Sequence, residues 1–260
     1  KQVAAVVELR ARFDEESNIE WARALERKGV NVVHGLVDLK VHAKAALVVR
    51  REGDSIRRYA HLSTGNYNYA TSQVYTDFGI LTARDEIGAD LTEFFNFLTG
   101  YASKQKYRKL LVGPKELRPR FESLIRREIE HAKAGREARL IFKVNAIIDP
   151  DIIALLYEAS GAGVPIDLIV RGNCCLRPGI PGVSENIRVI SIVGRFLEHG
   201  RVFYFRNGGN DEVYLGSADL MPRNLNWRVE LVFPVEDQAL LRHLRDDVLE
   251  VYLRDNVNAR

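Results

Sequence analysis

The sequence predicts an α/β protein in which two similar units follow one another along the chain, each with a mixed β-sheet flanked by helices. The order strand, helix, strand and further strands occurs twice, which is typical of mixed α/β sheets. In each unit a histidine also precedes a basic residue by two positions at one strand, His42 with Lys44 and His199 with Arg201. A chain of 260 residues, 46% hydrophobic and 28% charged, is long enough for two such domains.

The first unit opens with an apolar run at residues 3–11, which predicts a buried strand. Because this strand starts with no lead-in, we expect the sequence to begin in the middle of a domain. Residues 14–29 predict a helix, with acidic residues in its first turn and Gly29 at its end. Further strands are expected at residues 30–37, 42–51, 57–64 and 77–83, and the run LKVHAKAALVV predicts that the strand opening at His42 is buried.

The second unit follows the same order, so we expect its elements to correspond one to one with those of the first. Residues 149–163 predict a helix with Asp149 before Pro150 at its start. Strands are expected at residues 138–146, 164–172, 187–193, 199–207, 212–220 and 228–235. Between the units lies a basic stretch with two prolines, SKQKYRKLLVGPKELRPRF. We therefore predict domains at residues 1–109 and 110–260, the second opened by a helix from about residue 115 to 133.

Charge and cysteine content limit the classes of function. The net charge of +3 is small, so an anionic partner would need positive charge that is concentrated locally. No apolar stretch is long enough to span a bilayer, and the first residues are not a signal peptide. Cys174 and Cys175 are adjacent and would strain a disulfide, so we expect two buried free thiols in a reducing cytosol.

The repeated histidines are the main functional signal. Side chains two positions apart on a strand lie on one face, so each histidine and its basic neighbour point into one place. About twenty residues later each unit has a small polar turn, STGN at residues 63–66 and GSAD at residues 216–219. Small residues let backbone N–H groups approach an anion, and hydroxyls add donors. A lone His-x-Lys is a weak motif, but its repetition with the turn favours a phosphoryl-transfer site.

Two histidines suit such a transfer because a neutral imidazole can attack phosphorus and form a phosphohistidine. The other can protonate the leaving oxygen, which contributes roughly 10²–10⁴-fold. Lys44 and Arg201 would stabilise negative charge on the phosphoryl oxygens. His61 and Asn66 are candidates to support these groups, although His61 is equally compatible with a purely structural role.

Longer stretches of the sequence resemble the phospholipase D superfamily and, within it, the bacterial polyphosphate kinases of the histidine-phosphorylated type. They cover nearly the whole chain in order: VELRARFDEESNIEWA, LKVHAKAALVVRREG, RRYAHLSTGNYN, YTDFGILT, KVNAIIDP, LIVRGNCCLRPG, GRFLEHGRVFYF and GSADLMPRNLNWRVE. Two departures argue against a lipase or nuclease of the superfamily. Its motif has an aspartate five positions after the lysine, where this chain has Val49, and Arg201 replaces the second lysine.

The resemblance implies two tandem phospholipase D-like domains that transfer the terminal phosphate of ATP reversibly onto inorganic polyphosphate, with ADP as the other product. It implies a cytoplasmic protein, a homo-oligomer at full length, with no nucleic-acid partner. Peripheral contact with the inner face of the membrane is compatible with the family. Family members carry further N-terminal domains, so we expect this sequence to be the C-terminal catalytic portion and the sheet of its first half to lack strands. Alone it should bind phosphate compounds but turn over weakly or not at all.

The resemblance also implies roles for individual residues. His42 would be the phosphorylated nucleophile, and His199 the nucleotide-side partner and general acid. Tyr75 matches a tyrosine that contacts the adenine nucleotide, and Arg171 and Arg228 match arginines that bind phosphate. From the residues alone, the more common role of Tyr75 is an ordinary strand aromatic, and that of the two arginines is a surface charge at a strand end.

Magnesium is the implied cofactor, and Arg12 matches a position associated with it. An arginine has no lone pair for a metal, so Arg12 would hold the phosphate to which the ion is bound. The sequence has no obvious acidic cluster built as a metal cage, which fits Mg²⁺ arriving with its nucleotide.

Two alternatives remain open at this point. One is a phosphodiesterase of the phospholipase D type, with the same covalent histidine and water or an alcohol as acceptor. The other is a non-catalytic module that binds polyanions, for which lysine and arginine would suffice without paired histidines.

Overall fold

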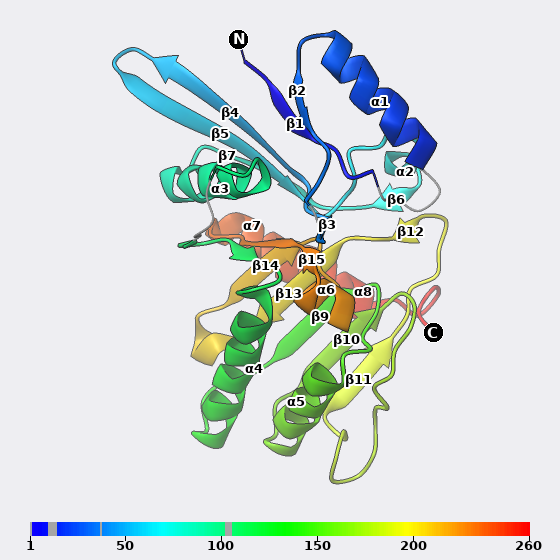
Figure 1. Ribbon diagram of the computed structural model, residues 1–260. Helices are drawn as coiled ribbons and strands as arrows, with labels where there is room; N and C mark the ends of the chain where they lie inside the picture. The colour runs from blue at the N-terminus through cyan, green and yellow to red at the C-terminus, as the bar shows by residue number, and fades with distance from the viewer. Residues whose placement is uncertain (1, 10–14, 37, 102–105) are drawn as a thin grey trace.

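The structure, a computed structural model, describes residues 2–9, 15–36, 38–101 and 106–260. Figure 1 shows two α/β halves, the first half (up to α3) above and the second half (from α4 onward) below. Each half contains β-strands with helices packed on them. The predicted α/β class, with the unit used twice, is confirmed.

Among the described residues the second half forms a seven-stranded mixed sheet in the order β11-β10-β9-β13-β14-β16-β8. Its strands are β8 (Leu111–Val112), β9 (Leu140–Val144), β10 (Ile166–Val170), β11 (Ile187–Ile190), β13 (Arg201–Phe205), β14 (Glu212–Gly216) and β16 (Leu231–Pro234). The first three in spatial order are parallel, and the remaining neighbours are antiparallel. Every residue of β9, β10 and β13 is buried, as expected of a sheet covered on both faces.

Helices from both halves cover this sheet. One face packs against α4 (Leu117–Lys133) and α5 (Pro150–Gly161). The other packs against α3 (Asp85–Leu98) of the first half and against the C-terminal helices. These are α7 (Gln238–Arg242), the π-helix η2 (His243–Leu249) and α8 (Glu250–Arg254). Since α3 contributes to this core, the two halves share one hydrophobic interior. None of the described helices is long and apolar enough to cross a membrane.

Local sequence explains why α5 starts where it does. Asp149 caps the helix by accepting a hydrogen bond from the backbone N–H of Ile152, and Pro150 follows at the first helical position. Both features agree with the sequence prediction. In the first half, α1 (Glu15–Arg27) ends just before Gly29, whose φ of 79° is the left-handed conformation expected after a helix.

The first half contains two separate small sheets among its described residues. β1 (Ala4–Val6) pairs in parallel with β2 (Asn31–Val33). β4 (Ala45–Glu52), β5 (Ser55–Ser63) and β7 (Gly79–Thr82) form an antiparallel sheet in the order β4-β5-β7. The prediction that the strand after His42 is buried is wrong, because α3 covers only one face of this sheet. Val48 and Val49 are 52% and 54% exposed, and the β4–β5 hairpin projects away from the second half (Figure 1).

The elements of the two halves correspond in order, but β1 differs from β9 in its strand pairing. In the second half β9 pairs with β13, but no described residue of β1 pairs with β4. A groove of about 960 Å³ lies there instead, lined by both strands and the end of α3. β1 and β2 form a parallel pair joined through α1, as β9 and β10 do through α5, so these are the matching pairs. Pairing partners are set by tertiary contacts, which hydrophobic periodicity does not report.

A buried carboxylate anchors the start of the second half. Asp90, on α3, is fully buried and accepts hydrogen bonds from the backbone N–H groups of Arg108, Lys109 and Leu110 at 2.9, 2.7 and 3.0 Å. Charge-assisted bonds of this kind are the stronger ones in proteins. The connection between the halves is therefore tied directly to α3.

The two cysteines form no disulfide, as predicted, but they are not buried. Cys174 is half-buried and Cys175 is exposed. Both lie in the connection between β10 and β11, at the surface of the second half, which is where loops are normally found.

Candidate active site

Two short parallel strand pairs join the halves and carry the two histidines. β3 (Lys40–Val41) pairs with β15 (Arg228–Val229), and β12 (Leu197–Glu198) pairs with β6 (Tyr75–Thr76). His42 follows β3 directly, and His199 follows β12 directly. The sequence predicts that each histidine begins a long strand, but the structure shows that neither does. Each lies in a short break where the chain leaves the strand pair between halves and enters its own sheet.

His42 is held in one orientation by a carboxylate of the second half. Its Nδ1 lies 2.9 and 3.1 Å from the two carboxylate oxygens of Glu230. An ionised carboxylate can only accept, so Nδ1 carries the proton and Nε2 keeps its lone pair. Burial lowers the pKa of His42 to about 4, with Glu230 opposing and Lys44 adding to the shift. The imidazole is therefore neutral near pH 7, as a nucleophile must be.

Glu230 is itself fixed from two sides. It is fully buried, and it accepts hydrogen bonds from the hydroxyl of Ser217 and the side-chain amide of Asn224. Burial alone would raise the pKa of Glu230, but His42, Lys44 and the Ser217 hydrogen bond hold it below its usual value. The carboxylate thus stays ionised and cannot rotate freely.

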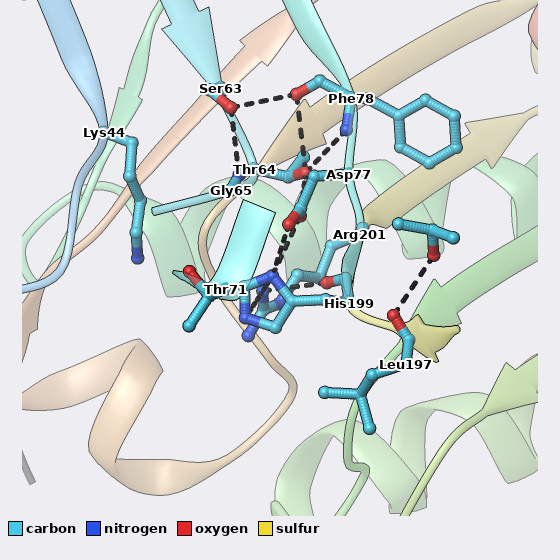
Figure 2. A network of polar contacts seen from close by, with 12 residues as sticks. Lys44, Ser63, Thr64, Gly65, Thr71, Asp77, Phe78, Leu197, His199 and Arg201 are labelled. Atoms are coloured by element: carbon cyan, nitrogen blue, oxygen red, sulfur yellow. Dashed lines mark hydrogen bonds and ion pairs between the residues drawn. The ribbon is translucent and has the colours of Figure 1, made fainter. Parts of the chain in front are cut away.

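The second histidine has the mirror-image arrangement. His199 Nδ1 lies 2.8 Å from Asp77 Oδ1 of the first half, and Thr64 donates its hydroxyl to the same oxygen at 2.6 Å. Figure 2 shows Asp77 between Thr64 and the imidazole, with Arg201 beside the same ring. Arg201 donates to Nε2 of His199 at 3.1 Å. Burial lowers the pKa of His199, with Asp77 opposing and Arg201 reinforcing the shift.

Each histidine therefore receives its carboxylate from the other half, and each carboxylate is held by a hydroxyl from the small polar turn of its own half. Sequence reasoning missed Asp77 and Glu230. A signal was present: Thr64 precedes Asp77, and Ser217 precedes Glu230, by the same 13 residues. Gly65 completes the first turn, where a Cβ atom would lie 2.6 Å from the carboxylate of Asp77.

The two predicted cations lie at the same place. Lys44 is 6% exposed, and its Nζ donates to the backbone carbonyl of His42 at 2.5 Å. Arg201 is 3% exposed and forms an ion pair with Asp219 at 3.1 Å. The charge of Arg201 acts on His42 as well as on His199, so both imidazoles share one electrostatic environment.

The residues assigned by resemblance flank the histidines. The ring of Tyr75 lies with its centroid 5.0 Å from that of His199. Arg171 donates to the backbone carbonyl of Glu198 at 3.2 Å, next to His199. Arg228 on β15 is the equivalent of Tyr75 on β6. Each lies two residues before the carboxylate of its strand pair, Glu230 and Asp77. The site therefore has an aromatic side chain beside one histidine and a cation beside the other.

Two further candidates lie apart from the histidines. His61, on β5, has Nδ1 2.7 Å from the hydroxyl of Tyr67 at the protein surface, and its described contacts do not include His42 or His199. Asn66 is exposed at the end of the small polar turn. Arg12, the candidate for holding a magnesium-bearing phosphate, lies outside the described residues.

The described residues do not fit a resident magnesium site. Among them no three histidine, cysteine, aspartate or glutamate side chains gather in a way that could hold a metal ion. The carboxylates of Asp77, Asp219 and Glu230 are already bound by histidine or arginine.

A pH dependence of anion binding follows from Lys44. Burial lowers the pKa of Lys44 to about 7, with Glu230 opposing and Arg201 reinforcing the shift. Above pH 7 the free protein loses this charge, so its affinity for inorganic triphosphate should fall by up to about tenfold per pH unit. In the Lys44→Arg variant the charge persists, and the fall should be shallower. Calorimetric titrations of both proteins from pH 6 to 9 would compare the slopes, and equal slopes would contradict the assignment.

Comparison with protein families gives two matches that together span most of the chain. Residues 1–104 match the family model described as polyphosphate kinase C-terminal domain 1, and residues 110–260 match polyphosphate kinase C-terminal domain 2. The chain is 58% identical over 259 residues to a polyphosphate kinase of Parasynechococcus marenigrum and 60% identical over 259 residues to one of Thermosynechococcus vestitus. Both matches extend over 100% of this chain, but over only 36% and 35% of the length of the two relatives.

Solved structures agree with this result. The polyphosphate kinase of Porphyromonas gingivalis superposes with a TM-score of 0.90 at 42% identity, over 100% of this chain and 39% of that one. The phosphatidylserine synthase of Haemophilus influenzae superposes with a TM-score of 0.64 at 12% identity, over 99% of this chain and 74% of that one, which concerns the fold alone. The predicted fold of two tandem phospholipase D-like domains is confirmed.

Proposed function

The chain belongs to the polyphosphate kinase family, and on this premise we propose that it catalyses reversible transfer of the terminal phosphate of ATP to inorganic polyphosphate through a phosphohistidine at His42. The proposal concerns the intact protein, because the chain spans about a third of the length of its relatives. The observation that supports it most is the pair of neutral imidazoles whose Nδ1 atoms are each fixed by a carboxylate from the opposite half.

In the first step the lone pair on His42 Nε2 attacks the terminal phosphorus of ATP. The N–P bond forms, and the bond from that phosphorus to the bridging oxygen breaks, its electron pair leaving with ADP. Glu230 keeps the proton on Nδ1, so Nε2 is available and the imidazolium that develops is stabilised. Lys44 and Arg201, whose charges act on His42, would stabilise the charge that the phosphoryl oxygens gain.

In the second step a terminal oxygen of polyphosphate attacks the phosphorus of the phosphohistidine. The N–P bond breaks, its electron pair returns to Nε2, and the chain is one phosphate longer. The same steps in reverse make ATP from ADP and polyphosphate. Both directions use the same groups.

His199 would act on the bridging oxygen of the leaving ADP. In the free protein it is neutral, and its Nε2 accepts a hydrogen bond from Arg201. The negative charge of bound phosphates favours the protonated imidazole. We therefore infer that His199 gains its proton as the nucleotide binds, and that Asp77 stabilises the resulting positive charge.

Nucleotide recognition belongs to the His199 side in this proposal. On that side Tyr75 would contact the adenine nucleotide and Arg171 its phosphates, while Arg228 would bind the phosphates from the His42 side. The substrate would be the magnesium complex of ATP, since the described residues do not form a metal site of their own. When bound, the ion would neutralise charge on the phosphates.

The test is a labelling experiment on the full-length protein. Incubation with magnesium and ATP labelled in the terminal phosphate should give protein-bound label that is acid-labile and base-stable, and that added ADP or polyphosphate removes. A phosphodiesterase would take no label from ATP and would instead cleave a model phosphodiester. A polyanion-binding module would do neither. Absence of the label under these conditions would contradict the proposal.

A further inference from the structure

A buried polar cluster lies behind His199, outside the groups used so far. Its central member is Lys143, on β9, which is only 2% exposed although it lies in an otherwise apolar strand. The other members are Glu198, Thr76 and Tyr252. A buried ammonium group is costly unless it is paired and hydrogen-bonded, so its presence in this strand needs an explanation.

Lys143 contacts the residues on both sides of His199. Its Nζ donates to the backbone carbonyl of Gly200 at 3.1 Å and lies 3.0 Å from Glu198 Oε2. One ammonium group thus holds the residue before the histidine by its side chain and the residue after it by its backbone. Gly200 is also tightly packed, since a Cβ atom there would lie 2.5 Å from the ring of Phe78.

Glu198 connects this ammonium group to the strand that carries Tyr75 and Asp77. Its Oε2 accepts hydrogen bonds from the hydroxyl of Thr76 at 2.9 Å and from that of Tyr252 at 2.6 Å. Thr76 lies between Tyr75, whose ring is beside His199, and Asp77, which orients it. The cluster therefore fixes both sequence neighbours of His199 and the strand that supplies its two contacts.

The other half of the site shows that the fold does not require this cluster. The register places Glu198 opposite Thr76 in the β12–β6 pair, and Val41 opposite Val229 in the β3–β15 pair. Beside His42 the same two positions are thus occupied by two valines, which have no polar side-chain atoms. A pair of apolar residues is sufficient to join the strands there. The polar arrangement is specific to the His199 side.

We propose that Lys143 is a positioning residue, which holds the His199 segment so that its Nε2 faces the bridging oxygen of the leaving nucleotide. This role rests on the proposed function, in which His199 assists departure of ADP. Burial lowers the pKa of Lys143 and Glu198 opposes that shift, in keeping with a paired ammonium group. Lys143 touches no reacting atom and acts only through Glu198 and Gly200.

The test is a single-turnover measurement on the full-length protein with the Lys143→Met variant. The amplitude of labelling by ATP reports the fraction of competent protein, and the rate constant reports the transfer step. We expect an amplitude close to wild type and a rate constant at least tenfold lower, a part of the roughly 10²–10⁴-fold that general acid catalysis contributes. A fall in amplitude at an unchanged rate constant would overturn the proposal, because it would show a purely structural role.

A second variant keeps the test decisive if Lys143→Met alone is unstable. In Lys143→Met the carboxylate of Glu198 loses its partner. Adding Glu198→Gln removes that unpaired charge, so the labelling amplitude should recover while the rate constant stays low. Transfer by the double variant at the wild-type rate would overturn the proposal.

Arg139→Met is the matched control. Arg139 lies just before the opposite end of the same strand and pairs with Glu250 and Asp167 at 2.6 and 2.8 Å. This variant should melt at a lower temperature and transfer phosphate at the wild-type rate constant. A rate constant as low as that of Lys143→Met would overturn the proposal. A wild-type protein that takes no label would overturn the proposed function and this role together, whereas equal rates in labelled proteins would overturn only the role of Lys143.

Discussion

No acid-labile label should remain on the protein when His42 is replaced by alanine, and the transfer rate should fall on the order of 10⁴-fold or more. The physical reason is the removal of Nε2, the atom that the Glu230 contact leaves with a lone pair. His199 does not substitute for it in the proposed mechanism, because its Nε2 acts on the bridging oxygen of the leaving nucleotide. Phosphorimaging of base-stable label after single-turnover incubation with ATP measures the effect directly.

The control for this variant is His34→Ala. His34 is exposed and pairs with Glu26 on the outside of the first half, so its loss removes an imidazole without touching the site. It should label at the wild-type rate. His42→Ala should still bind inorganic triphosphate, because Lys44 and Arg201 remain. Persistent acid-labile label in His42→Ala would place the nucleophile elsewhere.

The second large effect is expected for Glu230→Gln, with a fall in the transfer rate of about 10³-fold. An amide can turn its NH₂ group toward Nδ1 of His42, which moves the ring proton to Nε2 and blocks the lone pair; the corresponding change in serine protease triads has an effect of about 10⁴-fold. The amide also gives weaker hydrogen bonds with Ser217 and Asn224 than the carboxylate does.

The pH profile separates orientation from protonation in this variant. Glu230 raises the pKa of His42 against the larger lowering effect of burial, so its removal would move that pKa below about 4. The imidazole is then neutral from pH 5 to 8 in both proteins. Glu230 also raises the pKa of Lys44, so the variant should lose the Lys44 charge at a lower pH than the wild type. The deficit of Glu230→Gln should therefore persist from pH 5 to 8 and should not shrink as the pH rises. Recovery at high pH would contradict an orienting role, and Glu236→Gln, at a surface ion pair, should match the wild type.

The sequence was sufficient to predict the repeated α/β unit and a basic residue two positions after each histidine, because these depend on local patterns. Apolar periodicity, the Asp149 cap and the His-x-Lys and His-x-Arg spacings are all local. The carboxylates were missed because Asp77 and Glu230 come from the opposite half, and no local pattern connects them with His199 and His42. Their equal spacing from the two turns became meaningful only once those contacts were known.

The errors in the fold have the same origin. The strand after His42 is apolar enough to be buried, but whether a second layer covers it depends on neighbours that the strand does not specify. Whether β1 also pairs with β4, as β9 pairs with β13, is likewise decided by contacts between elements. Lys143 is a charge inside the apolar run ARLIFKVNA, and in the structure it pairs with Glu198, next to His199.

Because each half supplies the carboxylate that orients the other half's histidine, the two histidines are oriented together or not at all. Any hinge motion that parts β3 from β15 and β6 from β12 would take Glu230 from His42 and Asp77 from His199 in the same movement. An open form that admits water would thus have two imidazoles without the carboxylates that orient them. In the proposed mechanism, this division of the site would suppress hydrolysis of the phosphohistidine by water.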